Sequence, residues 1–440
     1  MQSSRIRQIL TLALPIIGGM VSQNLLNLID TGMVGSLGDA ALAAVGTGSF
    51  LNFLSIAFVT GLSAGVQAMS SRRKGENRLD EMALPLNGAL LVAIVVSIPL
   101  CFLLASQAKL LFSWVNDSAE VLVLGESYYR VRLYAMAAVG MNFAFRGYWN
   151  GISRPGLYMM TLVIMHVTNI FLNWVFIFGN LGAPALGAYG AGLATTLSTY
   201  LGTFIYFVMG WRLARPNGFL AGIPNGQQIS NLLRLAVPNG IQQMFFAGGF
   251  TVLFWILGQV GTATASAANV LINVVLVAIL PGIALGIASA SLVGQALGRS
   301  EPEEAKQWGW DVVKVGIGLL CVLGIPMWAA PRLVLGIFLH NPETLELAVG
   351  PLRLVGLTIW LDGMGLVLLN ALLGAGDARR TMIISVFLQW FVFLPVAYLV
   401  GPHWGWGLMA IWVAQVGYRA IQAGVFAWIW HRGDWVKIKV

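Results

Sequence analysis

The chain has 440 residues, of which 58% are hydrophobic and only 10% charged, with a formal net charge of +8. Soluble domains carry about 25% charged residues, so this composition excludes an ordinary soluble protein and predicts an integral membrane protein. The basic residues are spread over short loops instead of being clustered with aromatic residues, which argues against a nucleic-acid-binding protein. Cys101 and Cys321 both lie in apolar runs, so neither a disulfide framework nor a cysteine-based metal site is indicated.

Apolar segments of about 20 residues can each cross the ~30 Å hydrocarbon core of a membrane as a helix. The first apolar run follows a basic N-terminus but lacks a cleavage site with small residues, so we interpret it as a retained helix. The chain is therefore predicted to be an all-α integral membrane protein. In chain order we predict about twelve spans, at 8–34, 43–69, 82–105, 121–143, 156–179, 186–211, 229–257, 265–293, 308–330, 345–373, 381–400 and 406–430.

The basic residues indicate how these spans are oriented. An even number of spans places both termini on one side, and the terminal segments together with the alternate loops hold 17 of the 25 basic residues. Because Lys and Arg concentrate in cytoplasmic loops, we expect both termini in the cytoplasm. Arg234, Lys314 and Arg419 lie within predicted spans but close to their ends, and we expect these side chains to extend toward the membrane surface.

An internal repeat divides the chain into two halves. Residues 12–15 (Leu-Ala-Leu-Pro) align with 235–238 (Leu-Ala-Val-Pro), and the glycines at 35 and 38 align with those at 258 and 261, all at one constant shift along the chain. We predict two six-helix bundles, 1–222 including a cytoplasmic linker and 223–440. Because each half has an even number of spans, we expect a pseudo-two-fold axis along the membrane normal and a cleft between the bundles.

Two acids stand out inside the predicted spans, Asp30 and Asp362. A charge at mid-membrane costs at least ~2.5–3.5 kcal/mol and tends to mark an ion or substrate pathway. Asp30 is in the outer half of the first span, so exposure to the outer water is the plain alternative. Asp362 is midway along the tenth span, where a structural pair with a neighbouring helix is the plain alternative. Their repeat counterparts are Leu253 and Ala137, so we expect the halves to share a fold but not the same chemistry.

Polar residues on other spans extend this candidate site. Asn169 and Asn173 are four residues apart and share one face of the fifth span, where they could hold a carboxylate's proton or complete the oxygen shell of an ion. Ordinary hydrogen bonding between helices is the competing interpretation. His166, on the same helix, is either a core residue or a participant in proton transfer. The weaker candidates for the substrate pathway are Asn142, His166, Thr195, Gln242 and Gln243.

No phosphate-binding loop, metal-ligand cluster or nucleophile–base arrangement is recognisable in the sequence. The sequence therefore predicts neither an ATPase nor another enzyme, and no cofactor is expected. Transport against a concentration gradient would then need an ion gradient.

Four motifs together resemble one family of transporters. They are Leu12-Ala13-Leu14-Pro15 followed by Asp30-Thr31-x-Met33-Val34-Gly35, then Asn169-x-x-x-Asn173-Trp174-x-Phe176-Ile177-Phe178-Gly179, then Gly187-x-x-Gly190-Ala191-Gly192-x-Ala194-Thr195, and finally Asp362 followed by Leu373-Gly374-Ala375-Gly376-Asp377. Over nearly the whole chain, the sequence resembles multidrug and toxic compound extrusion (MATE) transporters.

The resemblance implies a V-shaped pair of six-helix bundles in the bacterial cytoplasmic (inner) membrane. Such a protein exchanges cytoplasmic drugs, usually organic cations, for external Na⁺ or H⁺ by alternating access. The expected partners are drug-like molecules and membrane lipid, with no nucleic acid, and the expected state is a monomer.

The resemblance also assigns roles to individual residues. Asp30 matches the acid of the first helix that binds the coupling ion, and Asn169 and Asn173 match polar positions around it. Some DinF-like members have an aspartate where Asn173 stands, whereas Asp362 resembles the tenth-helix acid of NorM-like members. The coupling ion is thus left open between H⁺ and Na⁺, with Asp30 or Asp362 as its possible Na⁺ ligand.

Two other functions compete with efflux. A flippase for a lipid-linked saccharide or another lipid could share the general fold, but we would expect more cationic residues in its cavity. A membrane-embedded enzyme is disfavoured because no set of His, Cys and acidic ligands converges in the spans.

Overall fold

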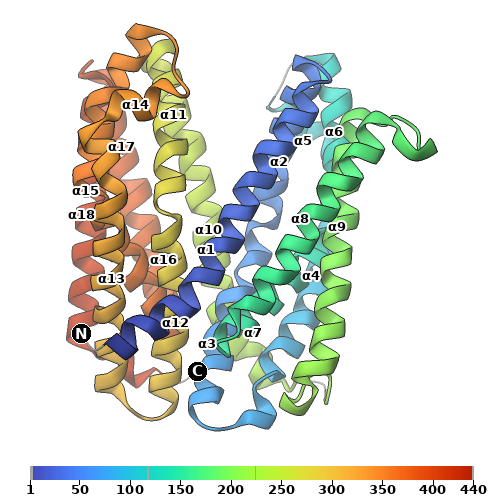
Figure 1. The fold of residues 1–440 in the computed structure, drawn as a ribbon, viewed down its shortest axis with the longest axis vertical. Coiled ribbons are helices and arrows are strands. Elements are labelled where there is room, and N and C mark those ends of the chain that lie inside the picture. Colours follow the sequence, from blue (N-terminus) through green and yellow to red (C-terminus); the bar gives the residue numbers. More distant parts are fainter. Residues whose placement is uncertain (1–2, 116–117, 223, 439–440) are drawn as a thin grey trace. The chain divides into compact units, whose positions relative to one another are not determined.

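The structure is a computed structural model that describes residues 3–115, 118–222 and 224–438. Within these ranges the regular elements are helices and no strand is present (Figure 1). The first half of the chain forms α1 (Ser3–Gly35), α2 (Asp39–Thr60), α3 (Leu62–Gly75), α4 (Leu84–Ser106), α5 (Ala108–Ser113), α6 (Ala119–Leu133), α7 (Met136–Gly151), α8 (Pro155–Phe178) and α9 (Gly187–Met209).

The second half continues with a similar succession of helices. It forms α10 (Gly226–Val260), α11 (Thr262–Ala278), α12 (Leu280–Gly298), α13 (Pro302–Ala329), α14 (Pro331–Gly336), α15 (Pro342–Ala375), α16 (Ala378–Phe387), α17 (Leu394–Tyr398) and α18 (Gly407–Arg432). Two π-helical segments, Leu388–Phe393 and Leu399–His403, flank α17 and make 378–403 one continuous helical stretch.

Ten helical segments of the described chain are long and apolar enough to cross a membrane. The two remaining predicted spans, 121–143 and 406–430, correspond to α6 with α7 and to α18. The expectation of an all-α membrane protein with about twelve spans is confirmed. Charged and polar residues such as Arg130 and Arg132 in α6 and Arg419 in α18 make these two spans less apolar than the others.

Three of the predicted spans are interrupted, a feature that apolar runs in the sequence do not indicate. The span 43–69 is divided into α2 and α3 at Gly61, and 121–143 is divided at Tyr134 and Ala135. The span 265–293 is divided into α11 and α12 at Ile279, ahead of Pro281 in the first turn of α12. Proline removes a backbone donor and is favoured in the first turn of a helix, which accounts for the break before Pro281.

The two short helices α5 and α14 were also not predicted. Both follow a long apolar helix directly. Their first residues, Ala108 and Pro331, are aligned by the same shift that aligns Pro15 with Pro238 in the sequence repeat. The structural repeat therefore includes connecting segments as well as the long helices.

The chain divides into two compact units. One is Gly18–Ile241, and the other combines the chain up to Ile17 with the chain from Gln242 onward. We call them the N-terminal and C-terminal units. The predicted boundary near residue 222 concerns the internal repeat and stays a prediction, because the compact units change within α1 and α10 instead.

Both changes of unit lie close to a proline inside a long helix. Pro15 of α1 lies just before the change at Ile17, and Pro238 of α10 lies just before the change at Ile241. A proline inside a helix removes one backbone hydrogen bond and is a common site of bending. The repeated Leu-Ala-x-Pro motif thus marks where each helix passes from one unit to the other.

The start of α1 is fixed to the C-terminal unit by charge and stacking. Arg5 Nε lies 2.7 Å from Asp311 Oδ2 on α13, and the Arg5 guanidinium stacks on the Trp308 ring at 3.7 Å. In the N-terminal unit, the first half of α10 packs closely on the junction of α2 and α3. A Cβ atom on Gly61 would overlap the carbonyl oxygen of Ala236 there, so glycine is required at this contact.

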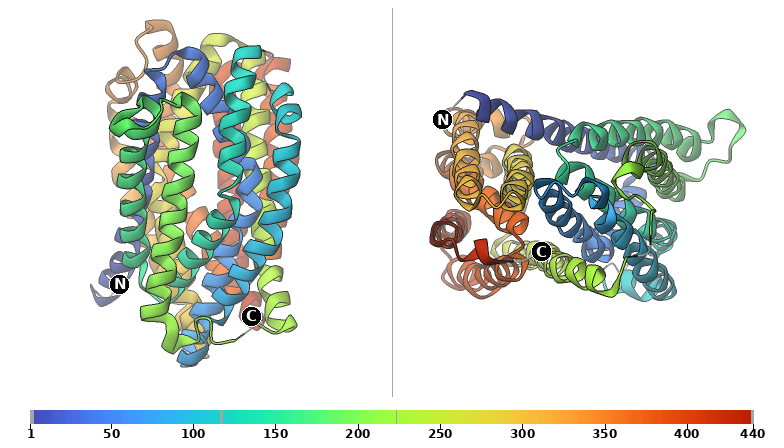
Figure 2. Two further views of the ribbon diagram at one scale, coloured as in Figure 1. Left: turned by 90° about the vertical axis from the view of Figure 1, so that its right-hand side faces the viewer. Right: turned by 90° about the horizontal axis from the view of Figure 1, so that it is seen from below.

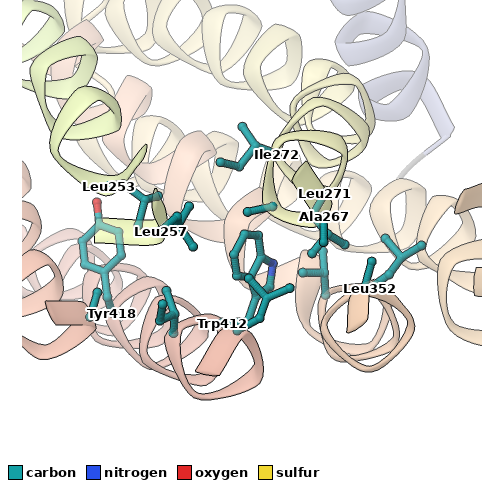
Figure 3. Packing of buried hydrophobic residues seen from close by; sticks show 14 of the residues in the cluster. Leu253, Leu257, Ala267, Leu271, Ile272, Leu352, Trp412 and Tyr418 are labelled. Atoms are coloured by element: carbon teal, nitrogen blue, oxygen red, sulfur yellow. The ribbon is translucent and has the colours of Figure 1, made fainter. Parts of the chain in front are cut away.

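An apolar cluster forms the core of the C-terminal unit. Figure 3 shows part of it, with residues from α10, α11, α15 and α18 pointing toward one another. Burial of such side chains contributes roughly 25 cal/mol per Å² in water, whereas in a membrane close packing has to supply the stabilisation. The residues labelled in Figure 3 are Leu253, Leu257, Ala267, Leu271, Ile272, Leu352, Trp412 and Tyr418.

Candidate functional site

The Asp30 carboxylate, near the end of α1, lies in a polar cluster with α8 and α9. Asn173 Nδ2 donates a hydrogen bond to Asp30 Oδ1 at 2.6 Å. Asn173 is fully buried and Asp30 half-buried. Asp30 therefore faces a protein partner, and the alternative of an acid exposed only to water does not describe it.

Asn169 is the second amide of this cluster. When its amide nitrogen faces the carboxylate, it donates to Asp30 Oδ1 at 3.2 Å, and its oxygen accepts from Thr195 Oγ1 at 3.0 Å and from Ser198 Oγ at 3.2 Å. The Asn169 amide thus donates to the carboxylate on α1, and its oxygen is held by hydroxyl groups of α9.

Helix geometry explains why these side chains meet. Asn169 and Asn173 are one turn apart on α8, and Thr195 and Ser198 are one turn apart on α9, so each pair lies on one helix face. Helices α8 and α9 lie side by side (Figures 1 and 2). The structure therefore brings together four residues from the sequence analysis, Asp30, Asn169, Asn173 and Thr195, and adds Ser198, which had been missed.

His166 occupies a second polar position between α1 and α8. Its ring is buried, with Nδ1 2.7 Å from Ser22 Oγ and Nε2 3.1 Å from Gln23 Oε1. Gln23 in turn donates from Nε2 to Asn27 Oδ1 at 3.1 Å. On α1 the residues 23, 27 and 30 share one face, and on α8 the residues 166, 169 and 173 share another. His166 and Asp30 thus lie on the same pair of polar helix faces, about two turns apart.

Asp362 forms an ion pair within the C-terminal unit. Arg419 Nε lies 3.1 Å from Asp362 Oδ1, and both side chains are about 15% exposed or less. The expectation that Arg419 extends toward the membrane surface is wrong. Arg419 lies in the middle of α18 (Gly407–Arg432), where its side chain cannot reach either end of the helix but does reach the carboxylate on α15.

A hydrogen-bond network links this ion pair to Gln242 on α10. Arg419 Nη1 donates to Gln422 Oε1 at 3.1 Å. Gln422 and Gln242 both donate to Ser385 Oγ, at 3.4 Å and 3.3 Å. Asp362 and Gln242 are separate candidates in the sequence, whereas in the structure Arg419, Gln422 and Ser385 connect them.

The other candidates lie apart from both clusters. Asn142 on α7 donates to the Thr199 carbonyl at 3.2 Å and accepts from Thr203 Oγ1 at 2.8 Å, so these hydrogen bonds join α7 to α9. Gln243 is exposed on α10. Leu253, the repeat counterpart of Asp30, lies in the apolar cluster of the C-terminal unit with only 2% exposure (Figure 3).

A metal ion in this protein would have to be bound by a single carboxylate together with the oxygens of amide and hydroxyl groups. Among the residues that the structure describes, no three His, Cys, Asp or Glu side chains gather in a metal-binding group. The Asp30 cluster offers one carboxylate and the oxygens of amides and hydroxyls, which is the donor type that hard cations such as alkali ions prefer.

Comparison with known proteins identifies the family. The model of the MatE family matches residues 15–175 and again 238–399, together more than half of the chain. The chain belongs to the MatE family. The two matches begin at Pro15 and Pro238, the prolines that the internal repeat aligns. The resemblance stated from the sequence is thus confirmed, and the members of this family are transporters, not enzymes.

Several bacterial relatives have a similar length and a related sequence. The "Probable multidrug resistance protein NorM" of Mesorhizobium japonicum is 27% identical, over 98% of this chain and 94% of the relative. The NorM protein of Pseudomonas aeruginosa is 29% identical, over 95% of this chain and 87% of the relative.

Solved structures of MATE transporters share the fold. An outward-facing multidrug resistance MATE transporter of the MOP superfamily has a TM-score of 0.90 at 21% identity, covering 99% of this chain and 97% of that one. A MOP superfamily transporter from Pyrococcus furiosus has a TM-score of 0.88 at 22% identity, with the same coverage. The protein is accordingly a multi-pass membrane transporter with the MATE fold.

Proposed function

We propose that this MATE protein is a secondary active multidrug efflux antiporter, which exports organic cations and other amphipathic drugs in exchange for H⁺ or Na⁺. The observation that carries the proposal is the Asp30 carboxylate held by the amide of Asn173 at 2.6 Å, with Asn169 adjacent. The multidrug resistance proteins among its relatives support the substrate class.

The proposed mechanism uses the charge of Asp30. When Asp30 is ionised, the amide donors of Asn173 and Asn169 stabilise the carboxylate, because hydrogen bonds to charged groups are worth about 1.5–3 kcal/mol. When H⁺ or Na⁺ neutralises the carboxylate, these amide donors lose the negative charge that they stabilise. A neutral site attracts a cationic drug less, so entry of the ion favours release of the drug.

Coupling requires the ion and the drug to favour different conformations. A ligand shifts a conformational equilibrium only through its difference in affinity between the states. Asp30, Asn169 and Asn173 are the proposed coupling residues, with Asp362 a second acid whose pairing is considered below. Thr195 and His166 extend the Asp30 region, and Asn142, Gln242 and Gln243 stay proposed positions along the substrate pathway.

The proposed location is the bacterial cytoplasmic membrane, with both termini in the cytoplasm. The concentration of Lys and Arg in the terminal segments and alternate loops supports this orientation. The proposed working form is a monomer surrounded by lipid, with small-molecule substrates.

Efflux from cells tests the role of Asp30. We expect Asp30→Asn to abolish efflux of ethidium or norfloxacin from cells that lack their own pumps, at equal membrane expression. Asp39→Asn is the matched control, because Asp39 is an exposed acid a short distance further along the chain, at the start of α2. Normal efflux by Asp30→Asn would overturn the proposal.

Reconstituted protein tests antiport and identifies the ion. Purified protein in liposomes should accumulate an organic cation when a pH gradient or a Na⁺ gradient is imposed, each in turn with the other absent. Accumulation with one gradient identifies the coupling ion. Equal cation movement with and without any gradient would exclude antiport.

A further inference from the structure

The acid of the C-terminal unit already has a cation of the protein as its partner. Arg419 Nε lies 3.1 Å from Asp362 Oδ1, and the side chains are 15% and 14% exposed. Asp30 differs, because its hydrogen-bond partners are the neutral amides of α8. The Asp362 carboxylate is therefore paired with a positive charge, whereas the Asp30 carboxylate is hydrogen-bonded to neutral amides.

Contacts on several sides hold the guanidinium of Arg419 in place. Nη1 donates to Gln422 Oε1 at 3.1 Å, and Gln422 is itself bound to Ser385. The guanidinium also lies 5.2 Å from the centre of the Tyr418 ring, a distance at which a cation is attracted to the ring face. Tyr418 belongs to the packed apolar cluster of Figure 3. Arg419 is thus anchored and is not a freely rotating side chain.

The space beside Arg419 is too small for a hydrated ion. The cavity that Arg419 lines with Phe246, Phe250 and Gln389 has a volume of about 10 Å³. Such a volume holds about one water molecule. An alkali ion that entered this cavity beside Arg419 would have to shed its water and find its oxygen ligands in the protein.

The nearby oxygens and charges also oppose a metal ion at Asp362. Gln422 Oε1 already accepts from Arg419. A second positive charge within about 4 Å of the guanidinium would be repelled, and this repulsion is stronger in a membrane interior than in water. One carboxylate can neutralise one cation, and Arg419 is that cation.

We propose that Arg419 is a tethered cation that occupies Asp362 and excludes Na⁺ from this carboxylate. Arg419 is thereby the residue that determines ion selectivity in the C-terminal unit. Of the two candidate acids Asp30 and Asp362, only Asp30 is then left to bind Na⁺. The proposal concerns ion binding and does not depend on drug efflux, so its failure and the failure of the proposed function are distinguishable.

Binding of radioactive Na⁺ to the purified full-length protein tests this proposal. Asp30→Asn serves as the background, so that only the C-terminal unit is observed. In this background we expect no saturable Na⁺ binding. Adding Arg419→Gln should produce saturable binding at least ten-fold above the background, and adding Asp362→Asn as well should remove it. Arg419→Lys keeps the positive charge and should bind no Na⁺.

The Na⁺-binding results either support or overturn the proposal that Arg419 excludes Na⁺ from Asp362. Saturable Na⁺ binding in the Asp30→Asn background that Asp362→Asn removes would overturn the proposal. So would a folded Arg419→Gln variant, verified by its melting temperature in choline chloride, that still binds no Na⁺. If Arg419→Gln does not fold, Asp30→Asn and Asp30→Asn/Asp362→Asn are compared directly, and equal background binding supports the proposal.

Discussion

Asn173 on α8 donates directly to the carboxylate of Asp30 on α1 at 2.6 Å, from a position with no exposed surface. Replacing Asn173 with Ala removes this donor while leaving the acid in place. A buried polar group that loses its partner costs about 1–3 kcal/mol. We therefore expect Asn173→Ala to raise the free energy of the ionised Asp30 state and to reduce drug efflux several-fold.

Asn180→Ala is the control for the Asn173 variant. Asn180 also loses an amide hydrogen bond on substitution, but that bond goes to the Trp174 carbonyl at 2.8 Å instead of to Asp30. Efflux assays and thermal melting of both variants separate coupling from stability. Equal efflux by Asn173→Ala and Asn180→Ala would contradict the role given to Asn173.

The ion pair of Asp362 and Arg419 should show strong energetic coupling. Removing one member of a buried pair leaves an uncompensated charge and typically costs about 3–5 kcal/mol. Asp362→Asn/Arg419→Gln removes both charges and should be more stable than Arg419→Gln alone. Thermal melting of the wild type, both single variants and the double variant gives the coupling energy. Additive losses in the double variant would show that the two side chains do not interact.

Glycine at position 61 permits the close contact between the α2–α3 junction and α10. A Cβ there would overlap the Ala236 carbonyl oxygen and lie 2.6 Å from Gly240 N. We expect Gly61→Ala to destabilise the protein by about 1–3 kcal/mol, as overpacking does elsewhere. Gly46→Ala is the matched control, because nothing lies within 4 Å of its Cβ position and alanine favours helices by about 1 kcal/mol. Similar melting temperatures for the two variants would contradict the contact.

Asp377, in the turn between α15 and α16 and outside the spanning segments, should make stability depend on pH. Burial raises the pKa of its carboxyl above the ordinary value, and Arg380 at 3.5 Å lowers the pKa in part. With its pKa raised by folding, the group favours the folded state below pH 3.8, and this contribution is lost as the pH rises through the folded pKa.

The substitution Asp377→Asn removes this titration. Its melting temperature relative to the wild type should therefore be higher at pH 7 than at pH 4. Asp80→Asn serves as a control, since Asp80 is an exposed acid in the short 3-10 helix Leu79–Glu81 that follows α3. A difference between Asp377→Asn and the wild type that is the same at both pH values would exclude the predicted effect.

The main residues of the Asp30 site could be predicted from the sequence, but not all of their hydrogen-bond partners. The i, i+4 spacing of Asn169 and Asn173 placed both amides on one helix face, and the cost of a charge in a membrane identified Asp30. Ser198 was missed because serine is common in membrane helices and only the packing of α8 on α9 brings it to Asn169.

Arg419 was misjudged for a related reason. The prediction that its side chain extends to the membrane surface used only the bounds of its own span. In the structure the side chain is placed by Asp362, which lies on a different helix, α15. Apolar runs located the long helices, but the breaks at Gly61 and at Tyr134 depend on local backbone packing that hydropathy does not report. Contacts between residues that are far apart in the chain could not be predicted from this one sequence.

The passage of α1 and α10 between units means that the two sequence halves are interlaced. The half that ends near residue 222 contributes its first helix end to the C-terminal unit, through Arg5 and Asp311, and the following half contributes the start of α10 to the N-terminal unit. The N-terminal unit, Gly18–Ile241, is one stretch of the chain, whereas the C-terminal unit is made of two segments and cannot be excised as one uninterrupted polypeptide. Halves divided at residue 222 and co-expressed should therefore purify as a complex, whereas each half alone would expose apolar surface that its partner normally covers.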